Sequence, residues 1–438
     1  MTFSADFFLS DDVPWLKLVV SFSVIVYTLH TYLDVRQLRA IRRPKPPAVL
    51  ADSYSMPEYK KTQAYNVDKW WFSFVSGAIQ EAIEVGLLTY YYLPWLWDRA
   101  DAVAWFLAKH ISWFHHNEIW VAVIFSLLDG AKDMVLGLPF GLYGTFVVEQ
   151  KHGFNKQTLG LFFLDILKSM GLGVVIMPPV IAAFTWILIH TGPMMPIYMW
   201  CFIFGLQIFF MTIYPVAIAP LFNKFSPLEK GTLREKIEEL AGSLKFPLTK
   251  LFVIDGSTRS AHSNAYMYGF FKNKRIVLYD TLIEQCKEPE VVAVLAHELG
   301  HWKMGHTIKN LVVTQIQTLA TFLLFSLVRS SRGLFTSFGF TKSQPAIIAY
   351  TLFSIISAPL SEVLGLLSNI MSRKYEFQAD NFAVSLGHTE ELKQALRKLD
   401  AKNRSAVNVD AWYSAYHHSH PPLVERLAAI DKSMKKTE

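Results

Sequence analysis

The chain has 438 residues and a net charge of +6, and hydrophobic residues make up 52% of it against 18% for charged residues. Its mean hydropathy of +0.26 favours a polytopic membrane protein over a soluble one. The sequence has no dense basic tract of the kind that binds nucleic acid, so nucleic acid is not an expected partner. The two cysteines, Cys201 and Cys286, predict neither a disulfide framework nor a thiolate metal site.

Seven apolar stretches are long enough to cross a bilayer, which takes about 20 residues. They cover residues 14–33, 70–97, 119–141, 159–190, 196–219, 308–328 and 346–370. Because no basic region precedes the first stretch, we interpret it as a retained anchor and not as a cleaved signal peptide. The predicted fold class is a mainly α-helical polytopic membrane protein with seven transmembrane helices. Its parts are 1–222 with helices one to five, 223–307 as a first cytosolic part, 308–370 with helices six and seven, and 371–438 as a second cytosolic part.

Basic residues set the expected orientation in the membrane. The first 13 residues contain no Lys or Arg, whereas the segment after the first span contains five. These five are Arg36, Arg39, Arg42, Arg43 and Lys45. The positive-inside tendency therefore places the N-terminus outside and this segment in the cytosol. Alternation of the spans then places 223–305 and the chain after residue 371 in the cytosol, although the loop at 329–345 puts three basic residues outside.

The longer soluble segment combines helix and strand signals. Residues 249–255 ("TKLFVID") and 274–280 ("KRIVLYD") are rich in β-branched residues and are predicted to form strands of a small β-sheet. A helix is predicted to begin near Pro289, with acidic residues in its first turn. This helix contains the motif "HELGH" at 297–301.

The H-E-x-x-H pattern indicates a zinc site. His297 and His301 are one helical turn apart, so their imidazoles can bind one ion. Glu298 beside them can act as general base on a water that the zinc activates. The simpler alternative is two ordinary helix histidines, and the apolar lead-in "VVAVLA" argues against it by giving the helix a buried side.

A catalytic zinc needs a third protein ligand, and Glu376 in "EFQAD" is the best candidate. Two histidines with a downstream glutamate make a gluzincin-like site. Asp380 lies one turn after Glu376 and is expected to orient a ligand histidine through its ring N–H. The alternative is a solvated acidic helix face. His306 follows His301 by five residues, on a different face, and is predicted to be a loop histidine.

A second metal hypothesis places the zinc inside the bilayer. The sequence "LLDG" at 127–130 resembles the Leu-Asp-Gly motif of intramembrane site-two proteases. In that class the aspartate follows H-E-x-x-H, whereas Asp129 precedes it. Charged soluble sequence also flanks the H-E-x-x-H helix here, which argues against this hypothesis.

Several spans carry ionisable residues, most of them in pairs three or four apart on one helix face. These residues are Glu81, Glu84, Asp129, Lys132, Asp133, Asp165, Lys168 and Glu362. Charges at membrane depth normally face the protein interior or water. The seven helices are therefore expected to surround a hydrated chamber, with interhelical ion pairs and snorkelling as the alternative.

Five motifs together resemble the type I CAAX prenyl endopeptidases, which are integral-membrane zinc metalloproteases. The motifs are "HELGHW", "EFQAD", "RSAHSNAYMYG", "FKNKRIVLYDTL" and "HHSHPPLVERL". The resemblance implies one Zn²⁺ per chain held by His297, His301 and Glu376, with Glu298 as catalytic base. It also implies that His420 stabilises the oxyanion of the reaction.

Further contacts with substrate follow from the same resemblance. The segment containing Asn264, Ala265 and Tyr266 matches an edge strand that binds an extended peptide, and Arg426 is a weaker candidate for substrate contact. The implied reaction removes the last three residues of prenylated CAAX proteins, and a second upstream cut in a longer precursor is also expected. Prenylated proteins and the lipid bilayer are the expected partners, and no obligate protein partner is inferred.

The expected location is the endoplasmic reticulum membrane, with the inner nuclear membrane as a further location and the protease site on the cytosolic side. Lys435 and Lys436 near the C-terminus resemble a dilysine retrieval signal, which works only on a cytosolic tail. Two other functions remain open at this point. One is a transporter or channel with a structural zinc, and the other is a quality-control protease that accepts unprenylated chains.

Overall fold

The computed structural model describes residues 12–269 and 274–437 of the chain, and helices make up most of it. The helices before the sheet are α2 (Trp15–Ile41), α3 (Met56–Thr89), α4 (Tyr92–His110), α5 (Glu118–Tyr143), α6 (Leu159–His190), α7 (Met195–Ile213) and α8 (Ala219–Phe222). The later helices are α9 (Thr232–Ser243), α10 (Asp280–Gln285), α11 (Glu288–Lys303), α12 (His306–Val328), α13 (Arg332–Ser337), α14 (Ala346–Ile356), α15 (Ala358–Ser385), α16 (Thr389–Lys402), α17 (Ala411–His417) and α18 (Leu423–Thr437). Short 3-10 or π turns occupy Ala48–Ser53, Gly144–Glu149, Gly192–Met194, Tyr214–Ile218 and Gly256–Thr258.

Among the described residues, four helical segments are long and apolar enough to cross a membrane. A fifth results when α14 and α15, which are bent by 59° against each other, count as one span. The four are Trp15–Ile41, Leu159–His190, Gly192–Phe222 and His306–Val328. A mainly helical membrane protein is thus confirmed, whereas the count of seven spans stays a prediction.

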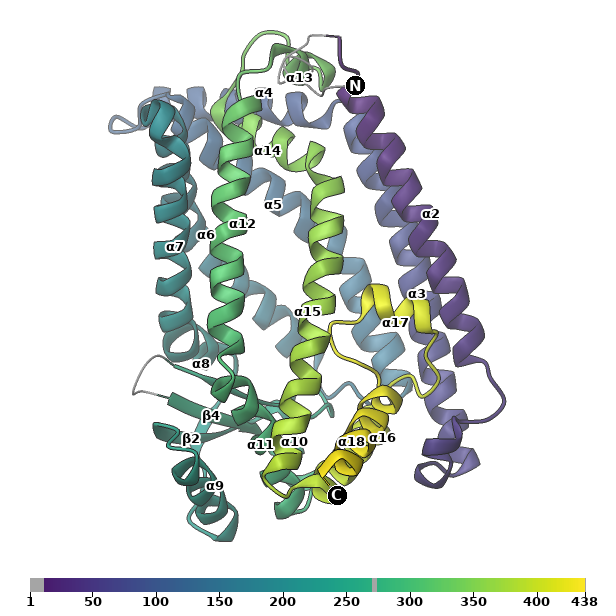
Figure 1. The fold of residues 1–438 in the computed structure, drawn as a ribbon. Coiled ribbons are helices and arrows are strands. Elements are labelled where there is room, and N and C mark those ends of the chain that lie inside the picture. The colour runs from purple at the N-terminus through teal and green to yellow at the C-terminus, as the bar shows by residue number, and fades with distance from the viewer. Residues whose placement is uncertain (1–11, 270–273, 438) are drawn as a thin grey trace.

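The stretch predicted as one span at 70–97 is divided between two helices, which corrects that prediction. Helix α3 begins earlier, at Met56, where Ser55 and Glu58 cap each other's backbone N–H groups. It ends at Thr89, and Tyr91 takes a left-handed conformation with φ of 55°. Helix α4 then starts anew and runs at the end of the molecule opposite the sheet (Figure 1). Apolar composition continues across this break, so a hydrophobic window cannot detect it.

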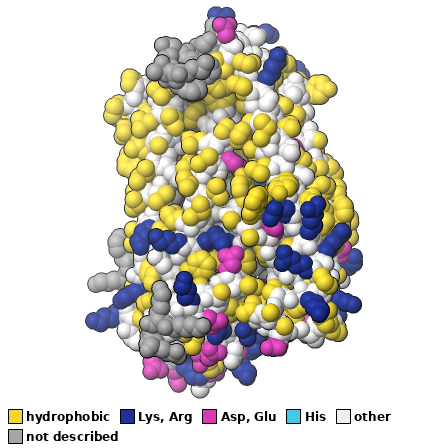
Figure 2. Space-filling model, turned by 45° about the vertical axis from the view of Figure 1, so that its right-hand side comes forward, with side chains coloured by type: hydrophobic (Ala, Val, Ile, Leu, Met, Phe, Trp, Pro, Cys, Tyr) yellow, Lys and Arg dark blue, Asp and Glu magenta, His cyan; other side chains and the backbone are white. Residues whose placement is uncertain are grey.

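The surface divides into an apolar part and a charged part. Figure 2 shows hydrophobic side chains over most of the upper part of one face, while charged side chains gather toward the lower end. Large apolar side chains are exposed on the long helices, including Ile25 (66%), Val175 (72%) and Ile316 (65%). Exposed apolar surface of this extent is costly in water and stable in lipid. The upper part is therefore the membrane region.

Most of the ionisable residues singled out in the spans have polar partners. The contacts are Ser23 with Glu81, Asp129 with Lys132 at 3.0 Å, Lys132 with Asp133 at 2.9 Å, Asp165 with Arg259 at 2.9 Å, and Glu362 with His30 at 3.0 Å. Pairing of this kind lowers the cost of charge at membrane depth. The ion-pair alternative thus accounts for part of the pattern, and the hydrated chamber stays a prediction.

A four-stranded sheet lies at the end of the molecule that also carries the C-terminus (Figure 1). Its strands are β1 (Phe225–Pro227), β2 (Leu248–Ile254), β3 (Ala265–Tyr268) and β4 (Lys274–Tyr279), in the order β1-β2-β4-β3. Strands β2 and β4 are parallel, and β1 and β3 flank them antiparallel. Both strands predicted from the sequence are confirmed, and β3 forms an edge of the sheet.

Helix α11 packs directly against the second half of α15, and Gly300 lies in close contact with it. A Cβ atom at Gly300 would lie 3.2 Å from the Cα of Ala379 and 3.1 Å from the Cβ of Phe382. Since Ala379 is fully buried, this contact leaves little room for a side chain. The glycine in "HELGH" therefore lets the helix with the two histidines lie against the helix with Glu376.

Replacing Asp400 with Asn is expected to stabilise the protein at neutral pH. Burial raises the pKa of Asp400 from 3.8 to about 6, although the Tyr54 hydroxyl donates a hydrogen bond to it at 2.7 Å. The folded state thus holds this proton more tightly than the unfolded state, and stability falls as the pH rises from about 4 to 6. We expect D400N to raise the free energy of unfolding by about 1–3 kcal/mol at pH 7 and to have little effect at pH 4. Chemical unfolding of both detergent-solubilised proteins between pH 4 and pH 7 measures the free energy of unfolding. The same pH dependence of this free energy in the wild type and in D400N would contradict the prediction.

Candidate active site

Helix α11 is fixed at its start and along one side. The backbone N–H of Lys287 donates to Glu290 at 2.7 Å, and Pro289 lies in the first turn. The Glu290 carboxylate is buried and pairs with Lys398 at 2.6 Å. The apolar residues from Val291 to Leu299 bury one side of the helix in the core beneath the sheet. His297 and His301 are thereby held one turn apart on a helix that cannot rotate.

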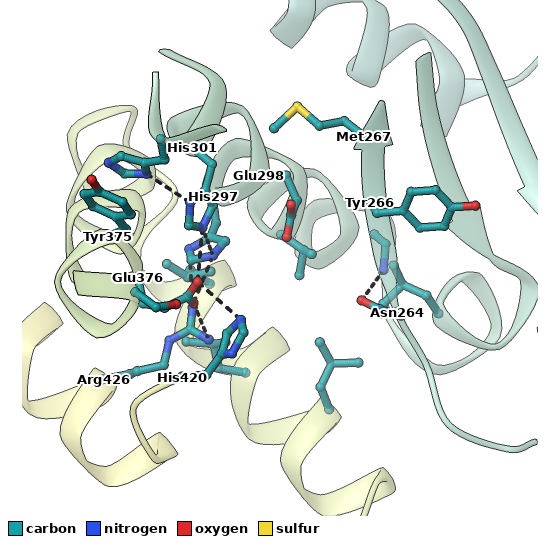
Figure 3. A pocket seen from close by; sticks show the side chains of 18 of the residues that line it. Asn264, Tyr266, Met267, His297, Glu298, His301, Tyr375, Glu376, His420 and Arg426 are labelled. Atoms are coloured by element: carbon teal, nitrogen blue, oxygen red, sulfur yellow. Dashed lines mark hydrogen bonds and ion pairs between the residues drawn. The ribbon is translucent and has the colours of Figure 1, made fainter. Parts of the chain in front are cut away.

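Figure 3 shows His297, His301 and Glu376 pointing toward one another. The two histidine Nε2 atoms are 3.2 Å apart, and the Glu376 carboxylate lies 3.5 Å from His297 Nε2 and 3.3 Å from His301 Nε2. A tetrahedral ion bound at about 2.0–2.2 Å from each atom needs ligand atoms about 3.3–3.5 Å apart. The three side chains therefore fit a zinc ion, and among the described residues they form the single cluster able to hold a metal.

Asp380 lies in contact with His297, as its position in the sequence suggests. Its Oδ1 atom lies 2.8 Å from Nδ1 of His297, and Arg426 donates to both of its oxygens at 2.8 and 2.5 Å. Since the carboxylate accepts a hydrogen bond from the Nδ1–H group, the lone pair of His297 is on Nε2, which faces the candidate metal position. The guanidinium of Arg426 is largely occupied by Asp380, so its contact with substrate stays a prediction.

His306 is not a loop histidine, which corrects the prediction for this residue. It is the first residue of α12, it is buried, and its Nδ1 lies 3.0 Å from Nδ1 of His301. Its Nε2 lies 3.0 Å from the side-chain oxygen of Gln378. The chain reverses at Gly305, whose φ of 68° ends α11 and turns the next residue back toward His301. Helical spacing mispredicts the position of His306 because α11 ends at Lys303, before this residue.

The charges around His297 favour a cation. Burial lowers the pKa of this imidazole, but its hydrogen bonds to Asp380 and Glu376 outweigh burial and raise the pKa to about 9. A group that holds a proton this tightly lies in a strongly negative site. A divalent ion can supply the same positive charge, and its binding then displaces the proton.

Glu298 lies beside the ligands, on the side that faces β3 (Figure 3). Its side chain is half-buried, and burial raises the pKa of the carboxyl above its usual value of 4.5. A raised pKa suits a carboxylate that has to accept a proton during catalysis.

A cavity of about 440 Å³ lies over these residues, and one side of it is the edge strand. Asn264, Ala265 and Tyr266 line it opposite the ligands, and the ring of Tyr266 points away from them (Figure 3). His420 also lines the cavity, with Nε2 at 3.4 Å from Glu376 and a side chain that is 68% exposed. The cavity thus combines a metal-binding cluster, a carboxylate and an edge strand on which a peptide can pair.

The rival motif "LLDG" takes no part in this site. Asp129 lies within α5 and pairs with Lys132 on the same helix. The ligand cluster consists of residues from α11 and α15. The geometry therefore favours the downstream glutamate over the upstream aspartate as the third ligand.

Two family profiles match the chain along most of its length. Residues 37–224 match "CAAX prenyl protease N-terminal, five membrane helices", and residues 227–434 match "Peptidase family M48". A CAAX prenyl protease 1 homolog of Arabidopsis thaliana is 50% identical over 97% of this chain and 100% of its own length. The human CAAX prenyl protease 1 homolog is 39% identical over 95% of both chains.

A solved structure agrees with this assignment. The crystal structure of S. mikatae Ste24p superposes with a TM-score of 0.90 at 36% identity, covering 96% of this chain and 99% of that chain. Identity and coverage of this size extend through the membrane helices and the H-E-x-x-H part alike. The chain therefore belongs to the CAAX prenyl protease 1 family of metalloendopeptidases, within peptidase family M48.

Proposed function

We propose that this chain is a zinc endopeptidase that removes the last three residues of prenylated CAAX proteins. The observation that carries the proposal is the convergence of His297, His301 and Glu376 in a cavity that also contains Glu298 and an edge strand. Three protein ligands leave one position of a tetrahedral ion open, which is typical of catalytic and not of structural zinc. This argues against a transporter in which zinc is only structural.

When bound, zinc supplies a Lewis acid that polarises a carbonyl oxygen and lowers the pKa of water toward about 7. Glu298 accepts the proton of the attacking water and passes it to the amine of the leaving tripeptide. His420 donates a hydrogen bond to the oxyanion that develops on the scissile carbonyl. Asp380 holds the ring of His297 in place, and Arg426 in turn holds Asp380.

The edge strand supports binding of an extended peptide. Strand β3 pairs with β4 on one side, and among the described residues no strand pairs with it on the other. A substrate can therefore add to this edge through backbone hydrogen bonds, with Asn264, Ala265 and Tyr266 along its path. A second cut in a longer precursor needs only a different register on the same edge.

The proposed setting is a protein with seven spans around a hydrated chamber and its protease site in the cytosol. In support, the C-terminal end of α2, which carries Arg39 and Arg42, lies at the same end as the sheet (Figure 1). A prenyl chain partitions into the bilayer at about 0.8 kcal/mol per methylene, so a site at the membrane edge meets its substrate there. We propose the endoplasmic reticulum membrane as the location, with the inner nuclear membrane as a further one; the side chains of Lys435 and Lys436 lie outside the described part.

Cleavage of matched peptides tests the proposal. Purified protein is incubated with a peptide that ends in Cys-aliphatic-aliphatic-X, in farnesylated and bare forms, and release of the tripeptide is measured. We expect release from the farnesylated peptide, loss of release with a chelator, and recovery with zinc. Chelator-insensitive release, or none, would contradict the proposal. Equal cleavage of both peptides would favour the quality-control function.

Replacing His420 with Ala is expected to slow the chemical step. One donor to an oxyanion contributes about 10²–10³-fold to kcat, so H420A lowers kcat by this factor and leaves KM and zinc content nearly unchanged. Steady-state kinetics with the farnesylated peptide measures the effect. H110A removes an exposed histidine on α4 and is the control. A rise in KM without a change in kcat would show that His420 binds substrate only.

A further inference from the structure

His306 links the second ligand histidine to the helix that carries the third ligand. Nδ1 of His306 faces Nδ1 of His301 at 3.0 Å, and Nε2 of His306 faces the Gln378 side-chain oxygen at 3.0 Å. The ring also stacks on Tyr375, with centroids 4.1 Å apart and planes at 11°. Both Tyr375 and Gln378 belong to α15, three residues apart on one face. The imidazole is therefore fixed in plane and in position.

These contacts determine which ring nitrogens carry protons. An amide oxygen can only accept a hydrogen bond, so Nε2 of His306 carries the proton and donates to Gln378. In the neutral ring Nδ1 of His306 is then an acceptor, and it accepts a hydrogen bond from the Nδ1–H group of His301. The lone pair of His301 is thereby left on Nε2, which faces Glu376 and the metal position.

We propose that His306, supported by Gln378, is a positioning residue that fixes the tautomer and orientation of His301 for zinc binding. The proposal rests on the zinc site proposed above and adds a partner for the one ligand histidine that Asp380 does not reach. It also gives the motif "EFQAD" a second role. Glu376 and Asp380 serve the metal from one face of α15, and Gln378 serves it from another face through His306.

A neutral partner on His301 suits the charge of the site. Asp380 already supplies one carboxylate behind His297, and Arg426 compensates it. A second carboxylate behind His301 would add negative charge to the ligands and weaken the ion as a Lewis acid. His306 and Gln378 provide the same orientation without charge, which preserves the power of the ion to polarise a carbonyl.

Zinc affinity of the metal-free full-length protein tests the proposal without any substrate. Affinity is measured in detergent by competition with a chromophoric chelator for the wild type, H306F, H306N and H116F. H306F keeps the ring stack on Tyr375 and removes the acceptor, whereas the Asn oxygen of H306N restores an acceptor near the position of Nδ1. His116 lies between α4 and α5, stacks on Trp105 of α4 with ring centroids 4.0 Å apart, and has its Nε2 2.8 Å from Asp101 of α4. It thus also combines a ring stack with a polar partner, far from the site in sequence, which makes H116F a matched control.

We expect H306F to weaken zinc binding by about 10–100-fold, as loss of a partner behind a ligand histidine does. H306N recovers most of this affinity, and H116F binds zinc as the wild type does, with all metal-free proteins unfolding at similar temperatures. Wild-type affinity in H306F would overturn the proposal, and so would equal losses in H306F and H116F. A wild type that binds no zinc would overturn the proposed function itself, so the two failures are distinguishable.

Discussion

The variant E298Q is expected to bind zinc as the wild type does and to cleave its substrate about 10²–10⁴-fold more slowly, the usual contribution of a general base. Glutamine matches glutamate in shape, so the half-buried position beside the ligands stays filled. It cannot take a proton from water, however, so the attacking nucleophile forms much more slowly. Zinc content and kcat/KM for the farnesylated peptide are the two measurements.

E284Q is the matched control for this prediction. Glu284 lies on α10, the helix before α11, and its side chain is exposed and outside the cavity. The same change of charge at this position is expected to leave cleavage unaltered. Full activity in E298Q, or loss of zinc together with activity, would contradict the assignment of Glu298 as the base.

The three side chains that form the candidate metal site could be singled out from the sequence because their spacing is local or part of a motif. Residues four apart in an α-helix lie on the same face, so His297 and His301 share one face, and Glu376 and Asp380 share another. The spacing of the motifs does not predict whether the segments with His301 and Glu376, which are 75 residues apart, lie in contact. The buried side of α11 and the small residues at Gly300 and Ala379 allow that contact, and only the fold could show it.

The residues that escaped prediction depend on turns and on long-range packing. Continued helical spacing places His306 away from His301, which predicts a loop histidine, but the reversal at Gly305 interrupts that spacing. Arg426 and Asp380 are 46 residues apart, and no periodicity predicts that a guanidinium from α18 would bind both oxygens of a carboxylate on α15. The glycine before His306 was the one local signal available.

In the overall fold, too, local sequence signals predict some elements, whereas others depend on backbone conformation that composition does not report. The strands at 249–255 and 274–280 follow from their β-branched residues. By contrast, hydrophobic composition predicts one span at 70–97, and this stretch crosses the break between two helices at Tyr91. Composition reports how apolar a stretch is, whereas a break depends on the backbone angles of one residue. Pro94, in the first turn of α4, is the sequence signal that a new helix starts there.

The variant R426M is expected to lower the free energy of unfolding of the metal-free protein by about 3–5 kcal/mol, since it removes one partner of a buried ion pair. Asp380 is fully buried, and the guanidinium of Arg426 donates to both of its oxygens. Methionine fills a similar volume without charge, so the buried Asp380 carboxylate loses the guanidinium and keeps only its contact with Nδ1 of His297. Chemical unfolding in detergent, in the presence of a chelator, measures the loss.

An exposed ion pair serves as the control that separates the effect of burial from the effect of removing a charge. Arg234 and Glu238 on α9 also form an ion pair, at 2.7 Å, but their side chains are 35% and 49% exposed. Water solvates both charges there, and R234M is expected to cost at most about 1 kcal/mol. Equal losses in the two variants would show that the Arg426 pair acts like any surface contact. A much larger loss in R426M means that Arg426 is the main partner that stabilises the buried Asp380 carboxylate beside His297. The candidate metal site and the stability of the protein then depend on the same contact.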